Sequence, residues 1–118
     1  MKILLVEDHK DTRVVLTSLL LLCQYQIITA DRCSEALVLL RGMNFGILLS
    51  DLMLPDGDGL DLVVQAKGLQ PHLRAIAMTS RASVSERQRG RKAGFDHYLT
   101  KPFEFHELRL ALEASASK

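Results

Sequence analysis

Short apolar runs alternate with segments of helical periodicity along the whole chain. The run at residues 3–6 is apolar throughout, which is typical of a strand buried on both faces. Similar runs predict strands over residues 26–30, 47–49, 73–78 and 98–99. Between them the apolar period lengthens, and this predicts helices over residues 11–23, 34–41, 60–67, 83–92 and 104–114. Proline and glycine at residues 55–59 predict a turn, and helices are expected to stop at Gly42, at Gly68 with Pro71, and at Gly94.

The regular alternation of strand and helix predicts the architecture. Strands that alternate with helices form a parallel sheet covered by helices on both faces, and right-handed crossovers leave few topologies. The binding crevice of such a sheet lies beyond the carboxyl ends of its strands. The residues at which each predicted strand ends are therefore the first place to look for chemistry.

Composition and charge exclude several classes of protein. A chain of 118 residues makes one domain, residues 1–118, and its 47% apolar and 25% charged residues are ordinary for a globular protein. Cys23 and Cys33 cannot form a disulfide scaffold, and we expect both to be buried as small hydrophobic residues. No apolar run is long enough for a membrane helix, and Glu7 follows residues 1–6 too soon for a signal peptide. A net charge of +1 and the lack of a nucleic-acid-binding motif favour a reduced cytoplasmic domain that binds neither nucleic acid nor membrane.

Polar side chains occur where four of the five predicted strands end. Glu7 and Asp8 follow the first strand, Asp51 the third, Thr79 the fourth and Lys101 the fifth. Because the carboxyl ends of parallel strands meet at one edge of the sheet, we expect these side chains to converge. Three neighbouring carboxylates repel one another, and their oxygens suit a hard divalent cation such as Mg²⁺. The lysine and the threonine would then hold a phosphoryl group from the other side.

One of these carboxylates is a candidate nucleophile. A carboxylate can attack phosphorus and form an aspartyl phosphate, and Asp51 ends the middle strand beside the acidic pair. A single aspartate after a strand is more often a helix cap or a turn residue. The phosphoryl-site interpretation therefore depends on all these residues falling at the same position in their strands.

Four motifs at these strand ends carry a resemblance to a known family. They are LVED at residues 5–8, DLMLP at 51–55 followed by Gly59, MTS at 78–80 and KPF at 101–103. Together they resemble the receiver domain of two-component response regulators over essentially the whole chain. The resemblance implies an α/β, flavodoxin-like three-layer sandwich, with a five-stranded parallel sheet in the order 2-1-3-4-5 and five helices. It also implies that Asp51 is phosphorylated by a partner histidine kinase or phosphotransfer protein, with slow loss of the phosphoryl group and no multiple turnover.

The resemblance also gives individual residues their roles. The Mg²⁺ ligands would be Glu7, Asp8, Asp51 and the backbone carbonyl of Met53. Thr79 and Lys101 would contact the phosphoryl oxygens, and the bond between Lys101 and Pro102 would be cis. Tyr98 matches the aromatic switch residue of the family. Gly46 departs from the family pattern, since many relatives carry Asp there, but this weakens no catalytic role.

The segment over residues 83–92 supports a conformational switch. Val84 is its only apolar residue, and Gly90 costs the helix about 1 kcal/mol relative to alanine. A helix with so little to bury is weakly anchored, so switching there costs little free energy. Our hypothesis is that Thr79 moves toward the phosphoryl oxygens and Tyr98 turns inward to fill the vacated space.

Other functions stay open at this point. A phosphohydrolase resembling the haloacid dehalogenases needs a second aspartate two positions after the nucleophile, where this chain has Met53. A receiver-like module that binds partners without being phosphorylated would not need the full acidic, threonine and lysine set. The chain could stand alone or come from a hybrid histidine kinase or a larger regulator. An output domain or downstream protein would dock on the face formed by residues 83–92, 96–100 and 104–114.

Overall fold

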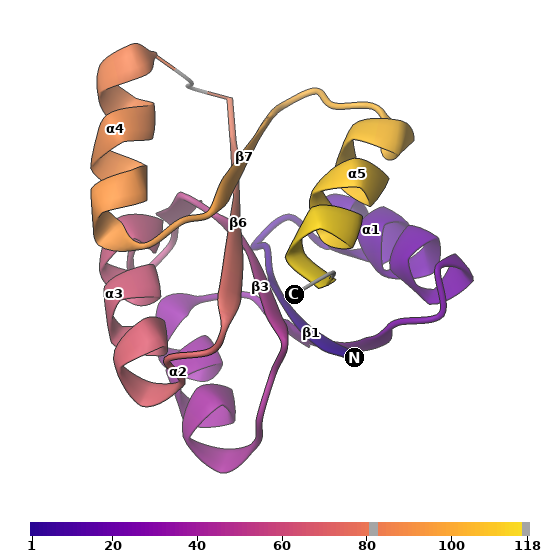
Figure 1. Cartoon of the computed structure of the whole chain (residues 1–118). Coiled ribbons are helices and arrows are strands. Elements are labelled where there is room, and N and C mark those ends of the chain that lie inside the picture. Colours follow the sequence, from indigo (N-terminus) through magenta and orange to yellow (C-terminus); the bar gives the residue numbers. More distant parts are fainter. Residues whose placement is uncertain (81–82, 117–118) are drawn as a thin grey trace.

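A central parallel sheet forms the middle layer of the molecule (Figure 1). The computed structural model describes residues 1–80 and 83–116, the side chain of Ala116 excepted. The sheet strands are β1 (Lys2–Val6), β2 (Gln26–Ala30), β3 (Ile47–Asp51), β6 (Arg74–Thr79) and β7 (His97–Thr100). Their order is β2-β1-β3-β6-β7, and every neighbouring pair is parallel. The predicted order 2-1-3-4-5 is confirmed, with β6 and β7 as its fourth and fifth strands.

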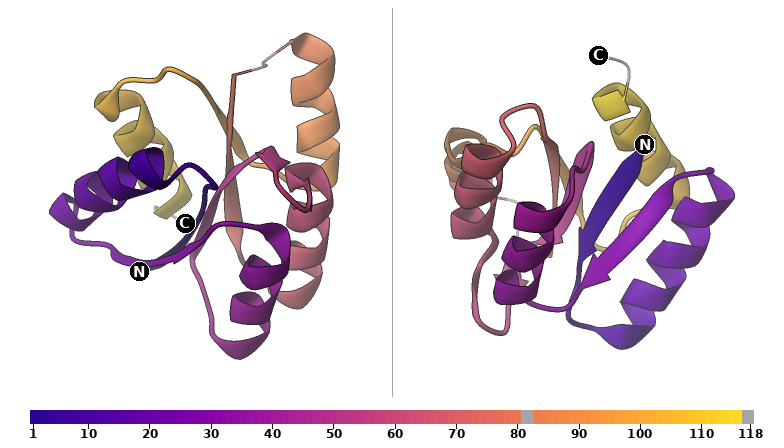
Figure 2. Two further views of the ribbon diagram at one scale, coloured as in Figure 1. Left: turned by 180° about the vertical axis from the view of Figure 1, so that it is seen from behind. Right: turned by 90° about the horizontal axis from the view of Figure 1, so that it is seen from below.

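Helices cover both faces of this sheet, as the alternation predicted. They are α1 (Lys10–Leu22), α2 (Cys33–Gly42), α3 (Gly59–Leu69), α4 (Val84–Ala93) and α5 (Phe105–Ala116). The views in Figures 1 and 2 place α1 and α5 on one face and α2, α3 and α4 on the other. This is the three-layer flavodoxin-like arrangement. Within the described part of the chain, none of the helices has the length and apolar character needed to cross a bilayer.

One of the predicted helix stops is misplaced. Helix α2 ends at Gly42 as expected, whereas Gly68 lies inside α3. A glycine ends a helix when the backbone turns with positive φ, which costs glycine little. Gly94 does so, with φ of 131°, and follows α4 directly. Helix α3 instead continues to Leu69 and ends two residues before Pro71, because helical geometry is disfavoured for the residue that precedes a proline.

The predicted turn contains a small antiparallel hairpin. Strand β4 (Met53–Leu54) pairs with β5 (Gly57–Asp58), forming a second, two-stranded sheet. We call residues 53–58 the hairpin. It lies between the end of β3 and the start of α3, and Asp58 caps α3 by accepting a hydrogen bond from the Leu60 N–H at 2.8 Å.

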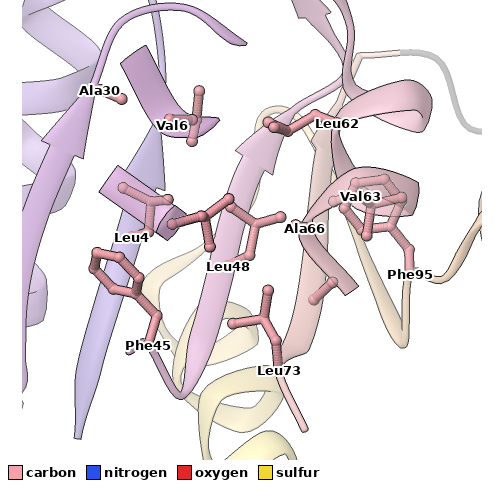
Figure 3. Packing of buried hydrophobic residues seen from close by; sticks show 14 residues of the cluster. Leu4, Val6, Ala30, Phe45, Leu48, Leu62, Val63, Ala66, Leu73 and Phe95 are labelled. Carbon is pink, nitrogen blue, oxygen red and sulfur yellow. The ribbon is translucent and has the colours of Figure 1, made fainter. Parts of the chain in front are cut away.

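The core consists of two apolar clusters, one on each face of the sheet. Successive residues of a strand point to opposite faces, so Leu4 and Leu48 pack toward α2 and α3 while Ile3 and Leu49 pack toward α1 and α5. Figure 3 shows the first cluster, with Leu48 near its centre. All five residues of β3 are buried. Cys23 and Cys33 are only half-buried, so their expected full burial is wrong; both are free thiols.

Helix α4 contributes little to this core. Gly90 is its only fully buried residue, and its single large apolar side chain, Val84, is 74% exposed. Helix α1, by comparison, buries Leu16 and Leu20. Since burying a leucine contributes about 1.5–3 kcal/mol, α4 is held much less firmly than α1.

We therefore expect the amides of α4 to exchange with solvent faster than those of α1. Helix α1 buries at least one more leucine than α4 does, so we expect its protection factors to be at least about tenfold higher. Hydrogen exchange followed by NMR or mass spectrometry measures both helices in one sample. Equal protection of α4 and α1 would contradict this prediction.

Candidate functional site

The parallel register brings four strand ends to one edge of the sheet. Asp51 is in register with Met78, and Thr79 with Thr100. Just beyond these pairs, the Lys101 N–H donates to the Thr79 carbonyl at 2.8 Å. Glu7 follows β1, which lies beside β3 in the sheet. The carboxylates, the threonine and the lysine therefore gather at the same edge because of strand register.

The Lys101 ammonium links two carboxylates at this edge. Its Nζ donates to Asp51 Oδ2 at 2.8 Å and to Glu7 Oε1 at 3.0 Å. The Glu7 side chain is fully buried and that of Asp51 is 12% exposed. A buried carboxylate is costly unless it is paired and hydrogen-bonded. The other Glu7 oxygen, Oε2, accepts from the His9 backbone N–H at 3.1 Å, so both oxygens of this buried group have donors.

Electrostatics hold the lysine in its charged form. Partial burial lowers the pKa of Lys101, but the hydrogen bonds to Asp51 and Glu7 outweigh this effect. The net result is a pKa above the usual value of 10.5. A fixed positive charge therefore lies between the acidic residues near neutral pH.

Asp8 and His9 complete the acidic end of the site. The Oδ1 atom of Asp8 is buried and accepts no hydrogen bond from the described residues, although His9 Nδ1 lies 3.3 Å away. The same imidazole nitrogen is 3.2 Å from Glu7 Oε2, and the ligand atoms of the three side chains lie within 4.8 Å of one another. A buried carboxylate oxygen without a donor is the kind of atom that a cation satisfies. The residues present thus fit a hard divalent cation such as Mg²⁺.

The hairpin forms the opposite wall of the site. The Met53 N–H donates to Asp51 Oδ1 at 3.2 Å, so each Asp51 oxygen has a partner, the second being Lys101. An open cleft of about 500 Å³ lies above these groups. Residues that line it include Asp8, Asp51, Met53, Pro55, Ser80 and Lys101. The Asp51 side chain therefore lines an open cleft.

Thr79 lies beside a second hollow rather than in the wall of the Asp51 cleft. Its residue is buried, and it borders a space of about 310 Å³ together with Leu54, Glu86 and Arg89. This hollow lies between the hairpin and α4. Thr79 is therefore placed between the acidic site and the weakly anchored helix.

Tyr98 packs against that helix. Its hydroxyl donates to the Glu86 carbonyl at 3.2 Å, and its ring makes an edge-on contact with Phe95 at 6.0 Å between centroids. A side chain at Gly90 would overlap the Tyr98 hydroxyl, so the observed position of the Tyr98 ring requires glycine at that point of α4. Burial, followed by the negative charge of Glu86, raises the pKa of the Tyr98 phenol. The ring is half-buried in this state.

Two polar contacts at the site are absent from the sequence-based expectations. Arg13 Nη1 donates to the Glu7 carbonyl at 2.8 Å, which braces the chain just before Asp8. The only signal for this in the sequence is an arginine in the first turns of the predicted helix. Asp56, expected only as a turn residue, accepts two hydrogen bonds from the start of α2. The peptide bond between Lys101 and Pro102 is cis.

Comparison with known sequences identifies one family over this whole region. The sequence model of the family described as Response regulator receiver domain matches residues 3–113. The response regulator MprA of Mycobacterium tuberculosis is 36% identical over 113 residues, which are 96% of this chain and 49% of that protein. The transcriptional regulatory protein CusR of Escherichia coli is 32% identical over 108 residues, 92% of this chain and 48% of that protein. This chain thus spans about half the length of these curated relatives.

Solved structures agree with the sequence comparison. The non-phosphorylated HemR receiver domain from Leptospira biflexa superposes with a TM-score of 0.91 at 34% identity, covering 99% of this chain and 94% of that chain. The receiver domain of the sensor histidine kinase PA1611 from Pseudomonas aeruginosa, solved with a magnesium ion coordinated in its active site cleft, has a TM-score of 0.90 at 26% identity. That alignment covers 99% of this chain and 98% of the other.

The buried ion pairs predict how stability depends on pH. A raised pKa means that the Lys101 contribution is complete below the usual value of 10.5 and is lost as the pH rises through the higher folded-state value. We expect Lys101→Met to lower the free energy of unfolding by about 2–3 kcal/mol at neutral pH, since Glu7 loses its partner. This deficit should shrink above about pH 10.5.

Chemical denaturation at a series of pH values measures this difference. Lys92→Met, which removes an exposed ammonium from α4, is the control and should leave the unfolding curve nearly unchanged. A Lys101→Met deficit that is constant up to about pH 12 would mean that the ammonium does not stabilise the two carboxylates.

Proposed function

The chain belongs to the response regulator receiver domain family of two-component systems, and from this we propose that it accepts a phosphoryl group on Asp51. The donor would be the phosphohistidine of a histidine kinase or phosphotransfer protein. The observation that carries the proposal is the Lys101 ammonium at 2.8 Å from Asp51 Oδ2 and 3.0 Å from Glu7 Oε1. It places a fixed cation next to a partly exposed carboxylate at the floor of an open cleft.

The transfer itself needs positioning and charge neutralisation more than covalent help. An Asp51 carboxylate oxygen would attack phosphorus while the bond from phosphorus to the histidine nitrogen breaks. The leaving imidazole keeps the electron pair of that bond and takes up a proton, and Asp51 becomes an acyl phosphate. Lys101 and the Thr79 hydroxyl would then contact phosphoryl oxygens from the side of β6 and β7.

Mg²⁺ is the cofactor that the acidic residues fit. Its holders would be the side chains of Glu7, Asp8 and Asp51 and the backbone carbonyl of Met53. When bound, it neutralises the negative charge shared by the carboxylates and the phosphoryl group. The buried Oδ1 of Asp8, which accepts no hydrogen bond from the described residues, supports a cation at this position.

Phosphorylation would be transmitted through Thr79 and Tyr98. A phosphoryl group adds about −1.5 to −2 charges, and attraction of the Thr79 hydroxyl to it would alter the hollow shared with Glu86. Tyr98 would leave its hydrogen bond to the Glu86 carbonyl and turn inward. Support comes from the weak anchoring of α4 and from the space that already exists between Thr79 and that helix.

The signal would leave the domain through the face around α4. Four exposed cationic side chains lie on that helix: Arg87, Arg89, Arg91 and Lys92. An output domain or a downstream protein would dock on α4, β7 and α5, the surface that movement of Tyr98 would alter. The curated relatives are about twice as long as this chain, which accords with such an output region in them.

Chemical phosphorylation tests the acceptor directly. Incubation with acetyl phosphate and Mg²⁺ should add the mass of one phosphoryl group, and chelation should prevent it. Asp51→Asn should abolish the gain, whereas Asp61→Asn, an exposed carboxylate in the first turn of α3, should leave it unchanged. Full labelling of the Asp51→Asn variant would place the acceptor elsewhere. An unlabelled parent protein would favour an interaction module that is never phosphorylated.

Removal of the Thr79 hydroxyl tests the switch separately. Thr79→Val keeps the branched shape, so Asp51 should still be labelled, but the Tyr98 ring should no longer respond. NMR of the tyrosine rings before and after phosphorylation measures this response, with Tyr25, distant in sequence, as the internal reference. If Tyr98 responds in Thr79→Val as it does in the parent, Thr79 does not couple phosphorylation of Asp51 to the movement of Tyr98.

A further inference from the structure

The amino end of α2 is capped by a residue far away in the sequence. Its own N-cap residue, Arg32, makes no side-chain capping hydrogen bond. Instead, Asp56 Oδ1 accepts from the Cys33 N–H at 2.7 Å and Oδ2 accepts from the Ser34 N–H at 3.0 Å. The first amides of a helix lack hydrogen-bond acceptors within the helix. A carboxylate of the hairpin supplies these acceptors, because no neighbouring side chain in the sequence does. We call this pair of hydrogen bonds the Asp56 latch.

The latch fixes the tip of the hairpin. Asp56 lies between β4 and β5, whose only pairing is Met53 with Asp58 and Leu54 with Gly57. Cys33 also touches this region: a side-chain carbon at Gly57 would lie 3.3 Å from its Sγ. The amides of Ser34 and Cys33 lower the pKa of Asp56 to about 2, so the carboxylate is ionised and suited to capping near neutral pH.

The hairpin in turn carries the backbone of the proposed site. The Met53 N–H holds Asp51 Oδ1 at 3.2 Å, and the carbonyl of the same residue is the proposed fourth Mg²⁺ ligand. A two-residue pairing has little stability of its own. A cation that binds through this backbone must hold it in one conformation, which costs conformational entropy. If the free protein already holds the backbone in that conformation, cation binding does not carry this cost.

We propose that Asp56 is a positioning residue for the Mg²⁺ site, acting by latching the hairpin to α2. This inference rests on the proposed function, because Met53 matters only if Mg²⁺ binds there. The latch favours the hairpin conformation that the cation needs, and by linkage Mg²⁺ binding strengthens the latch. Helix α2 thereby becomes a support for the metal site, although it contributes none of the proposed ligands.

The same hairpin offers a matched control. Asp58 is also an exposed, capping aspartate, but its partner is Leu60, only two residues away at the start of α3. Asp58→Ala removes a helix cap without releasing the hairpin from α2. Both variants should lower the melting temperature to a similar degree, since each loses one cap. Only Asp56→Ala should also lower the affinity for Mg²⁺.

Isothermal titration of the full chain with Mg²⁺ alone tests the proposal. We expect Mg²⁺ affinity to fall roughly three- to tenfold in Asp56→Ala, because only part of what the cap contributes to stability is coupled to the metal site. Asp56→Asn, whose single amide oxygen can accept one of the two bonds, should fall in between, and Asp58→Ala should bind like the parent. At saturating Mg²⁺, Asp56→Ala should be labelled by acetyl phosphate as fully as the parent.

Each outcome decides between the two proposals. Parent-like Mg²⁺ affinity in Asp56→Ala, or an equal loss in Asp58→Ala, would overturn the latch and leave the proposed function intact. A parent protein that binds no Mg²⁺ would overturn both. Broadening of the Met53 amide signal in metal-free Asp56→Ala, and not in Asp58→Ala, is the expected sign that the hairpin has become mobile.

Discussion

A fully buried carboxylate is the constraint on which the rest of the site depends. Glu7 ends up without solvent because β1 lies inside the sheet, and its charge is tolerable only with donors on both oxygens. Lys101, which directly follows β7, supplies one of these donors and contacts Asp51 with the same nitrogen. The ion pairs therefore tie the ends of β1, β3 and β7, the second, third and last strands in the sheet order, to one another at the edge where the candidate site lies.

The sequence was sufficient for the sheet and for the strand ends, because both follow from periodicity and register. Glu7, Asp51 and Lys101 could be expected at one edge as soon as five parallel strands were expected. The hairpin and the Asp56 latch could not be expected, since the partners of Asp56 lie 22 and 23 residues away and no local pattern marks them. The expected stop at Gly68 was wrong because a glycine can also adopt helical geometry, so the residue type alone does not mark the end of a helix.

The site combines parts of different rigidity. Asp51 is the last residue of β3 and Glu7 directly follows β1. The residues of both strands are almost all buried, so packing on both faces of the sheet fixes the positions of the two carboxylates. Thr79 and Tyr98 face α4, which buries only one residue fully. Besides its local cap, this helix is joined to β7 by the hydrogen bonds of the Tyr98 hydroxyl to the Glu86 carbonyl and of Arg87 to the Thr100 hydroxyl. The proposed phosphoryl acceptor therefore lies on a strand fixed by packing, whereas the two proposed switch residues border the helix that is held less firmly.

The contact between Tyr98 and Gly90 bears on efforts to make this protein more robust. Replacing helical glycines by alanine is a common way to gain about 0.4–1 kcal/mol each, because alanine restricts the unfolded chain. Gly42 and Gly68 have open space around them and suit this strategy. At Gly90 the added methyl group would displace the tyrosine ring, so a substitution meant only to stabilise the fold would also move a proposed switch residue.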